Sequence, residues 1–344
     1  MKSIRFNQTM VAAALAFATL SAQAAIALPP AFTALYVFGD SLSDSGNNYL
    51  QFGNVTGPAP INATFVPTYP YAPSFPVPGT LPDYSNGPSW VTPFAAGLGL
   101  GAFALPSLMG GGNYAYGGAR MVIDGVAPPP LPVNFPPSLQ TQLNTYLGSN
   151  AVSATALYVI AGGGNDVRDL GTTLNGNPAH DTPLIVSGAT AYATAAAQLV
   201  GALKLGGAQN IVVWNVPDVG KTPAAGSGVG PAAAGASAIA GAFNSFLSMA
   251  LASSGVTIFD SYSLIGGIVA NPAALGFTNV TQACGFFGNG CDASSALFWD
   301  GIHPTAFTHQ YIANQMLAAV PEPSTYLLFA VGLAGLLAWR RRTA

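Results

Sequence analysis

Charged residues are scarce in this chain of 344 residues. Asp, Glu, Lys and Arg make up 6% of it, against about 25% in ordinary globular proteins. Residues 25–320 contain eleven aspartates, no glutamate and four basic residues, which gives this stretch a net charge of −7. So few Lys and Arg side chains argue against a basic patch for nucleic acid or anionic lipid. We expect no nucleic-acid partner.

Cysteine and histidine are also rare, with two and three residues respectively. Cys284 and Cys291 are close in sequence, and in an oxidising compartment such a pair usually joins. The disulfide would contribute about 2 to 2.5 kcal/mol in the chain-entropy model. A metal site would need further Cys or His at metal-ligand spacing, and none accompanies the pair. We expect a disulfide and no metal.

The first 24 residues have the layout of a secretory signal peptide. Lys2 and Arg5 precede an apolar run over residues 10–20, and small residues at Ala22 and Ala24 offer a cleavage site. A buried first helix is the alternative. We expect export across the inner membrane, and a location outside the cell or in the cell envelope.

Residues 321–344 have a different pattern. Pro321-Glu322-Pro323 leads into 14 apolar residues, Tyr326 to Trp339, followed by three arginines. As a helix the run would be roughly 21 Å long, short for a membrane about 30 Å thick. The segment resembles the PEP-CTERM sorting signal of Gram-negative bacteria, which implies transient membrane association and removal by an exosortase-type enzyme. A permanent C-terminal anchor is the alternative.

The stretch between the two ends, residues 25–320, is predicted to be one α/β domain. Half of the whole chain is hydrophobic, enough for a sizeable core. Continuous apolar runs indicate strands buried on both faces, as in a parallel sheet. These strands are expected at residues 34–38, 113–116, 156–161, 210–216 and 256–259, and helices at 138–147, 190–205, 231–253 and 305–320. Alternating strands and helices predict a three-layer α/β/α sandwich with a central parallel sheet.

Two polar clusters suggest a nucleophile and its base. Ser41 follows the first expected strand in Gly39-Asp40-Ser41-Leu42, at the end where ligands bind in such sheets. A serine hydroxyl needs a base within hydrogen-bond reach and a third group that orients the base. Asp300 and His303, three residues apart, offer both. Taken alone, each cluster also fits a helix N-terminus in which Asp or Ser caps the helix.

Two further clusters offer donors for an oxyanion. Gly117 and Gly118 follow the expected strand at 113–116 and expose backbone N–H groups, and Asn165 places an amide at another strand end. Acyl transfer needs such donors where negative charge develops on the substrate oxygen. Gly and Asn also suit ordinary turns, which is the alternative for both clusters.

Together these segments resemble, in order, the blocks of the GDSL/SGNH hydrolase family. The resemblance spans residues 38–304 and implies a flavodoxin-like fold. It implies Ser41 as nucleophile, His303 as base and Asp300 as its orienter. The implied oxyanion donors are Ser41, Gly118 (or its neighbour Gly117) and Asn165. Residues 85–90 also resemble a family segment and are expected to shape the acyl pocket.

The function expected from this resemblance is hydrolysis of carboxylic esters through an acyl-enzyme, without a cofactor. The expected substrate is an ester of a lipid, an aryl compound or an acetylated sugar. An acyltransferase with the same triad and a non-catalytic envelope or biofilm matrix protein are the alternatives. Residues 49–112, rich in Pro, Gly and aromatics, are expected to form a lid or binding loop.

Overall fold

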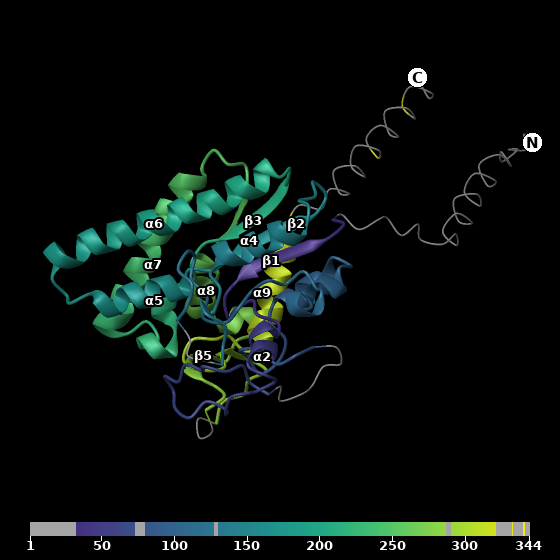
Figure 1. Ribbon diagram of the computed structural model, residues 1–344. Coiled ribbons are helices and arrows are strands. Elements are labelled where there is room, and N and C mark those ends of the chain that lie inside the picture. Colours follow the sequence, from purple (N-terminus) through teal and green to yellow (C-terminus); the bar gives the residue numbers. More distant parts are fainter. Residues whose placement is uncertain are drawn as a thin grey trace, which may run out of the picture. The chain divides into compact units, whose positions relative to one another are not determined.

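Four short parallel strands form the central sheet of the computed structural model. They are β1 (Leu35–Gly39), β2 (Leu157–Ala161), β3 (Asn210–Trp214) and β4 (Thr257–Phe259), adjacent in that order (Figure 1). The structure describes residues 32–72, 80–126, 130–286 and 290–320, with Gly332 and Arg340. The expected signal peptide and nearly all of the expected sorting segment lie outside these residues. The strands confirm the predicted parallel sheet.

The remaining expected strand, at residues 113–116, is not a regular strand. It is present only as irregular pairing along the edge of β1 that faces away from β2. Val37 and Asn113 form an isolated parallel bridge. Val37 also accepts a hydrogen bond from Tyr114 N–H at 2.8 Å, and Gly39 accepts one from Tyr116 N–H at 3.1 Å. Counted as the second strand, this segment gives the spatial order 2-1-3-4-5, which is the flavodoxin-like order.

Helices cover both faces of the sheet, which confirms the three-layer α/β/α sandwich. On one face, Phe38, Ile160 and Val213 join a buried cluster with three helices, namely α4 (Leu139–Ser149), α6 (Pro178–Leu205) and α7 (Gly230–Leu251). On the other face, Trp214 lies against Trp90, with ring centroids 4.7 Å apart. The helices α3 (Val91–Gly97) and α9 (Ala306–Ala319) pack together on this side.

Several elements lie outside the sequence prediction. They are α2 (Asn47–Gln51), α3, α5 (Gly164–Thr173), α8 (Ser261–Ala270), and the parallel pair β5 (Asn279–Ala283) and β6 (Ala296–Phe298). The 3-10 turns are Gly101–Ala104, Ser107–Met109, Val219–Lys221, Pro223–Ala225 and Ala273–Leu275. Helix α6 begins twelve residues before the expected start, because Asn177 caps it and Pro178 follows at the first position.

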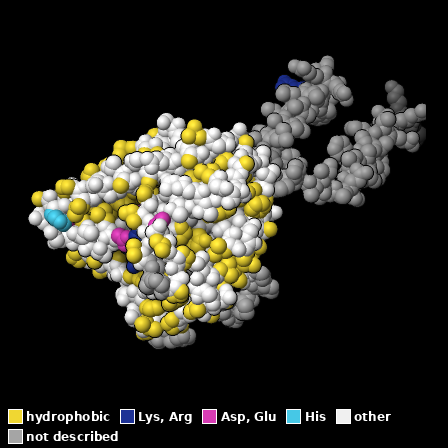
Figure 2. Space-filling view, in the orientation of Figure 1, with side chains coloured by type: hydrophobic (Ala, Val, Ile, Leu, Met, Phe, Trp, Pro, Cys, Tyr) yellow, Lys and Arg dark blue, Asp and Glu magenta, His cyan; other side chains and the backbone are white. Residues whose placement is uncertain are grey.

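Within the described residues, α6 and α7 are long and apolar enough to cross a membrane by length and composition alone. Both are built into the main core, to which they contribute Leu199, Leu203, Phe243 and Leu247. We therefore treat them as core helices of the domain. The apolar composition of these helices agrees with the low charge of the whole chain. Figure 2 shows few charged side chains on the face in view.

Candidate active site

Ser41 lies just beyond the carboxyl end of β1, in the loop between the strand and α2. Gly39 is required at the end of the strand, because a Cβ there would come within 2.7 Å of the Ala161 carbonyl oxygen. Asp40 Oδ1 accepts the Leu42 N–H at 3.0 Å and so closes the turn around Ser41. Burial raises the pKa of Asp40 to about 6. The turn presents the serine hydroxyl at the edge of the sheet.

Asp300 and His303 lie in the loop between β6 and α9. Asp300 Oδ1 accepts the backbone N–H groups of Ile302 and His303, at 2.8 and 2.7 Å, which fixes the loop. The other carboxylate oxygen, Oδ2, is 2.7 Å from His303 Nδ1. Both side chains are buried. The carboxylate therefore holds the imidazole at one nitrogen and leaves the other free to act.

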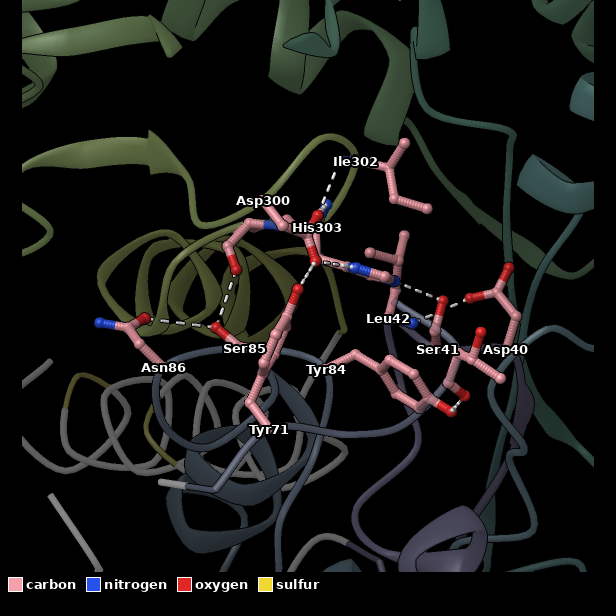
Figure 3. A network of polar contacts seen from close by, with 12 residues as sticks. Asp40, Ser41, Leu42, Tyr71, Tyr84, Ser85, Asn86, Asp300, Ile302 and His303 are labelled. Atoms are coloured by element: carbon pink, nitrogen blue, oxygen red, sulfur yellow. Dashed lines mark hydrogen bonds and ion pairs between the residues drawn. The ribbon is translucent and has the colours of Figure 1, made fainter. Parts of the chain in front are cut away.

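The imidazole reaches the serine hydroxyl across 262 residues of sequence. His303 Nε2 lies 2.8 Å from Ser41 Oγ, and Figure 3 shows Ser41, His303 and Asp300 joined in one line of contacts. The structure thus brings together the three side chains expected to form the triad. A hydroxyl in hydrogen-bond contact with an oriented imidazole is the arrangement that nucleophilic catalysis requires.

The expected oxyanion donors border the same space. Ser41, Gly117, Gly118, Asn165 and His303 all line one groove. Among the described residues, no protein acceptor is found for the N–H groups of Ser41 and Gly118. By contrast, Gly117 N–H is occupied by Asp44 Oδ2 at 2.9 Å. Asn165 Nδ2 donates one proton to the Ala119 carbonyl at 2.9 Å and keeps its second proton available.

Asp44 is a part of the site whose role depends on a contact between distant loops. Its carboxylate accepts the backbone N–H groups of Gly46, Asn47 and Asn48 as a cap would, but also that of Gly117 from a distant loop. Burial raises the pKa of Asp44 to about 6. The approach of Gly117 to a carboxylate 73 residues away had no local signal in the sequence.

Two tyrosines from the segment 49–112 also reach the triad. Tyr71 donates its hydroxyl to Asp300 Oδ2 at 2.8 Å. The ring of Tyr84 lies beside the His303 ring, with centroids 5.3 Å apart. Both tyrosines are buried. Figure 3 shows Tyr71 pointing toward Asp300 and Tyr84 lying near His303. The segment was expected to form a lid or binding loop. These two residues pack against Asp300 and His303, and Phe52, Tyr69 and Tyr84 of the same segment line the groove beside Ser41.

Ser85 and Asn86, from the segment 85–90 that was expected to shape the acyl pocket, contact the first residue of α9 and the loop just before this helix. Ser85 Oγ donates to the Pro304 carbonyl at 2.8 Å, and Asn86 Oδ1 accepts the Ala306 N–H at 2.8 Å. Ser85 and Asn86 therefore hold the chain between His303 and α9. Neither is among the described residues that line the two cavities next to Ser41.

Two cavities meet at Ser41 and His303. The first, which we call the apolar pocket, is lined mostly by nonpolar side chains, namely Leu42, Trp214, Val219, Leu264, Ile265, Phe298, Ile302, Pro304 and Ile312. The second, which we call the broad groove, is more open and mixes aromatic and charged side chains, among them Phe52, Tyr69, Tyr84, Phe135, Arg120, Arg168 and Asp169. The serine hydroxyl is thus accessible from two chemically different sides.

The expected disulfide joins Cys284 to Cys291. Cys284 follows β5 and lies next to β6, the strand that leads into the loop of Asp300 and His303. Two hydrogen bonds join the segments, from Cys284 N–H to Phe298 O and from Gly285 N–H to Trp299 O. Among the described residues, no group of three His, Cys, Asp or Glu side chains is placed to hold a metal ion. The absence of a cofactor remains a prediction.

Comparison with known families and proteins gives two matches to family models. The model described as GDSL-like Lipase/Acylhydrolase matches residues 35–316. The model of the PEP-CTERM protein-sorting motif matches residues 319–342.

Individual relatives include esterases from bacteria and plants. Esterase EstA of Pseudomonas aeruginosa is 31% identical over 351 residues, covering 93% of this chain and 51% of EstA. GDSL esterase/lipase At1g73610 of Arabidopsis thaliana is 27% identical, covering 83% of this chain and 88% of the relative. The chain therefore spans about half the length of EstA. Among solved structures, LAE5, an alpha/beta hydrolase enzyme from the metagenome of Lake Arreo, is 15% identical with a TM-score of 0.43, covering 85% of this chain and 97% of LAE5.

Proposed function

The chain belongs to the family of GDSL-like lipases and acylhydrolases, and on that premise we propose that it is an exported serine esterase that hydrolyses carboxylic esters. The observation that carries the proposal is the continuous contact from Asp300 through His303 to Ser41, with 2.7 Å at one imidazole nitrogen and 2.8 Å at the other. The hydrolase domain is proposed to extend over residues 25–320.

In the proposed reaction, Ser41 Oγ attacks the carbonyl carbon of the ester while its proton passes to His303 Nε2. The carbonyl oxygen becomes an oxyanion, which accepts hydrogen bonds from the N–H groups of Ser41 and Gly118 and from the Asn165 amide. Collapse of this intermediate breaks the bond to the alcohol oxygen, which takes the proton from Nε2. Asp300 stabilises the imidazolium throughout but keeps its own charge.

The second half of the reaction repeats these steps with water. Water gives a proton to His303 Nε2 and attacks the acyl-enzyme, and the oxyanion donors act again. The bond to Ser41 Oγ then breaks, Oγ recovers the proton from Nε2, and the carboxylic acid leaves. Each oxyanion donor is worth about 10²- to 10³-fold in rate in comparable hydrolases.

The two cavities suggest how the ester is divided between them. The alcohol must depart before water can enter, whereas the acyl group stays bonded to Ser41. The more open groove therefore suits the alcohol, and the apolar pocket suits a hydrocarbon acyl chain. Aromatic and charged side chains in the groove, such as Tyr69 and Arg168, are compatible with an alcohol that has both polar and apolar parts.

The C-terminal segment carries a match to the PEP-CTERM protein-sorting motif, which supports export in a Gram-negative bacterium. We propose that residues 1–24 act as the signal peptide. We also propose that residues 321–344 associate transiently with the membrane, are processed by an exosortase-type enzyme, and leave the domain secreted or attached to the envelope. A change in mass between the protein made with and without an exosortase would test the processing step.

The proposed activity is tested with p-nitrophenyl acetate and butyrate. Wild-type protein should release p-nitrophenol and become labelled by a fluorophosphonate probe. Ser41→Ala should lose both while its circular dichroism is unchanged. Undiminished turnover by Ser41→Ala would refute the assignment. Absence of turnover and of labelling in the folded wild type would favour a non-catalytic envelope protein.

An acyltransferase uses the same triad, with an acceptor alcohol in place of water. The groove beside Ser41 has room for either, so the distinction depends on the products. Turnover of p-nitrophenyl butyrate in the presence of a sugar or glycerol acceptor should give free butyric acid from a hydrolase. A butyryl ester of the acceptor as the main product would identify a transferase.

A further inference from the structure

We propose that Tyr71 is a positioning residue of the triad, which acts by holding the Asp300 carboxylate in place for His303. The inference rests on the proposed function. It assigns to the segment 49–112 a role inside the site, in addition to any contact of that segment with substrate.

The contact is direct and buried. Tyr71 Oη lies 2.8 Å from Asp300 Oδ2, and the two residues are 3% and 0% exposed. Burial, and then the charge of Asp300, raises the pKa of Tyr71 well above its ordinary value. The phenol therefore keeps its proton and acts as a donor to the carboxylate.

The oxygen that Tyr71 contacts is the one that holds the imidazole. Asp300 Oδ2 accepts both the Tyr71 hydroxyl and His303 Nδ1, whereas Oδ1 accepts two backbone N–H groups of its own loop. Without the Tyr71 hydroxyl, the His303 imidazole would be the one described side chain hydrogen-bonded to Asp300 Oδ2. A hydrogen bond to the charged form of a carboxylate stabilises that form and limits its attraction for a neighbouring proton.

Tyr71 is itself held firmly. Its backbone N–H donates to the Asp83 carbonyl at 2.8 Å, and its backbone pairs with Gly57 in an isolated bridge. Its ring meets the edge of Trp299, the residue before Asp300, with centroids 6.1 Å apart. A donor fixed in this way sets the position of the carboxylate and does not follow it.

Removal of the hydroxyl in Tyr71→Phe has two expected effects. The carboxylate attracts the imidazole proton more strongly. The acidic limb of the kcat/KM profile should therefore move to higher pH, by about half a pH unit or more. The rate kcat falls by roughly three- to tenfold because the Asp300–His303 pair is held less firmly, while KM changes little.

The other titratable groups that act on the dyad are unchanged in this variant. They are Asp40 next to Ser41, Tyr84 beside the imidazole, Arg168 in the lining of both cavities, and the buried His309 on α9. A shift of the acidic limb is therefore attributable to the lost phenol.

The matched control is Tyr146→Phe. Tyr146 is also fully buried, and its hydroxyl pairs with that of Tyr158 at 3.1 Å in the core. Both variants should lose similar thermal stability, but only Tyr71→Phe should change the pH profile. If the two variants lower the melting temperature equally and neither moves the acidic limb, Tyr71 has only a structural role and the proposal is wrong.

An NMR titration without substrate separates this proposal from the proposed function. The Nδ1 proton between His303 and Asp300 should give a downfield signal, assigned by its loss in His303→Asn, and its titration should move up in Tyr71→Phe. Such a shift in a protein without esterase activity would support the Tyr71 proposal and refute the function. An unchanged signal and titration in folded Tyr71→Phe would overturn the proposal, whatever the activity.

Discussion

The backbone N–H of Gly117 donates a hydrogen bond to Asp44 Oδ2 over 2.9 Å. The same carboxylate accepts N–H groups from the segment that follows Ser41, so one buried side chain joins the two segments that carry two of the three proposed oxyanion donors, Ser41 and Gly118. The N–H of Gly117 is already hydrogen-bonded to Asp44. The N–H of the next residue has no described protein acceptor, which supports Gly118 as the oxyanion donor. Gly118 adopts a φ of 82°, a conformation in which a glycine is favoured.

Replacement of Asp44 by Asn should reduce catalysis more than substrate binding. An amide has one accepting oxygen, and its NH2 group would face backbone N–H donors, so the two loops could not both stay bonded. We expect kcat for p-nitrophenyl butyrate to fall by roughly 10- to 100-fold with little change in KM, because oxyanion contacts act in the transition state. Asp124→Asn, at a carboxylate that accepts groups from Ser138 and Thr141 at the start of α4, is the control. Equal losses in both variants would leave Asp44 with a folding role only.

A larger side chain at Leu264 should shorten the acyl chain that the protein accepts. Leu264 lines the apolar pocket and is partly buried. In Leu264→Trp, kcat/KM for p-nitrophenyl octanoate should fall at least tenfold relative to that for the acetate, since the longer chain loses its space. Leu108→Trp, at a residue that is half exposed and away from both cavities, should keep the wild-type ratio. A parallel loss for both esters would place the acyl chain elsewhere.

Asp166 should make the folded protein less stable as the pH rises through a defined window. Burial raises its pKa to about 6, against about 3.9 in an unfolded chain. Between these values the native state binds more protons, so the free energy of unfolding falls as the pH rises. Asp166→Asn removes this pH dependence. The free energy of unfolding of the variant, relative to that of wild type, should therefore increase by up to about 1.4 kcal/mol for each pH unit between pH 4 and 6.

The measurement is urea unfolding of wild type and Asp166→Asn at pH 4.5, 6 and 7.5. The difference between the two proteins is used because buried His309, whose pKa burial lowers to about 3, acts in the opposite direction in both. Asp292→Asn, at an exposed carboxyl, should give a difference that does not grow across this window. A difference for Asp166→Asn that is independent of pH would contradict the expected shift.

Loss of the disulfide should weaken the domain close to the triad. The double variant Cys284→Ala/Cys291→Ala should lose about 2 kcal/mol of stability. Because Cys284 and Gly285 are hydrogen-bonded to Phe298 and Trp299, kcat should fall as well. Dithiothreitol should lower the melting temperature of wild type toward that of the double variant, and should leave the variant itself unchanged. If the reductant had the same effect on both proteins, the disulfide would not be its target.

The sheet could be predicted because its signals are local, and the proposed site because its segments resemble, in order, those of a known family. Continuous apolar runs marked the strands, and polar residues that follow them in a parallel sheet must gather at one edge. Helix α5 was missed because Gly162, Gly163 and Asn165 suggest a turn, although Asn165 lies in the first turn of this helix. The early start of α6 was within reach, since Asn177 followed by Pro178 is a common helix N-terminus.

The part of the site that escaped prediction depends on contacts between distant residues. Tyr71 and Asp300 are 229 residues apart, and nothing in the pattern around Tyr71 distinguishes it from the other aromatics of the segment 49–112. The pair β5 and β6 was missed for a related reason. Both are short, and Asn279–Ala283 lacks a clear alternation of apolar and polar residues, so only their pairing defines them.

The sequence separation of 262 between Ser41 and His303 also means that the two residues are synthesised at different times. A ribosome that adds about 5 to 20 residues per second completes the imidazole's segment tens of seconds after the serine. Until then the growing chain carries the proposed nucleophile without its proposed base. The proposed activity therefore requires the C-terminal part of the domain, including β6 and α9, to be folded.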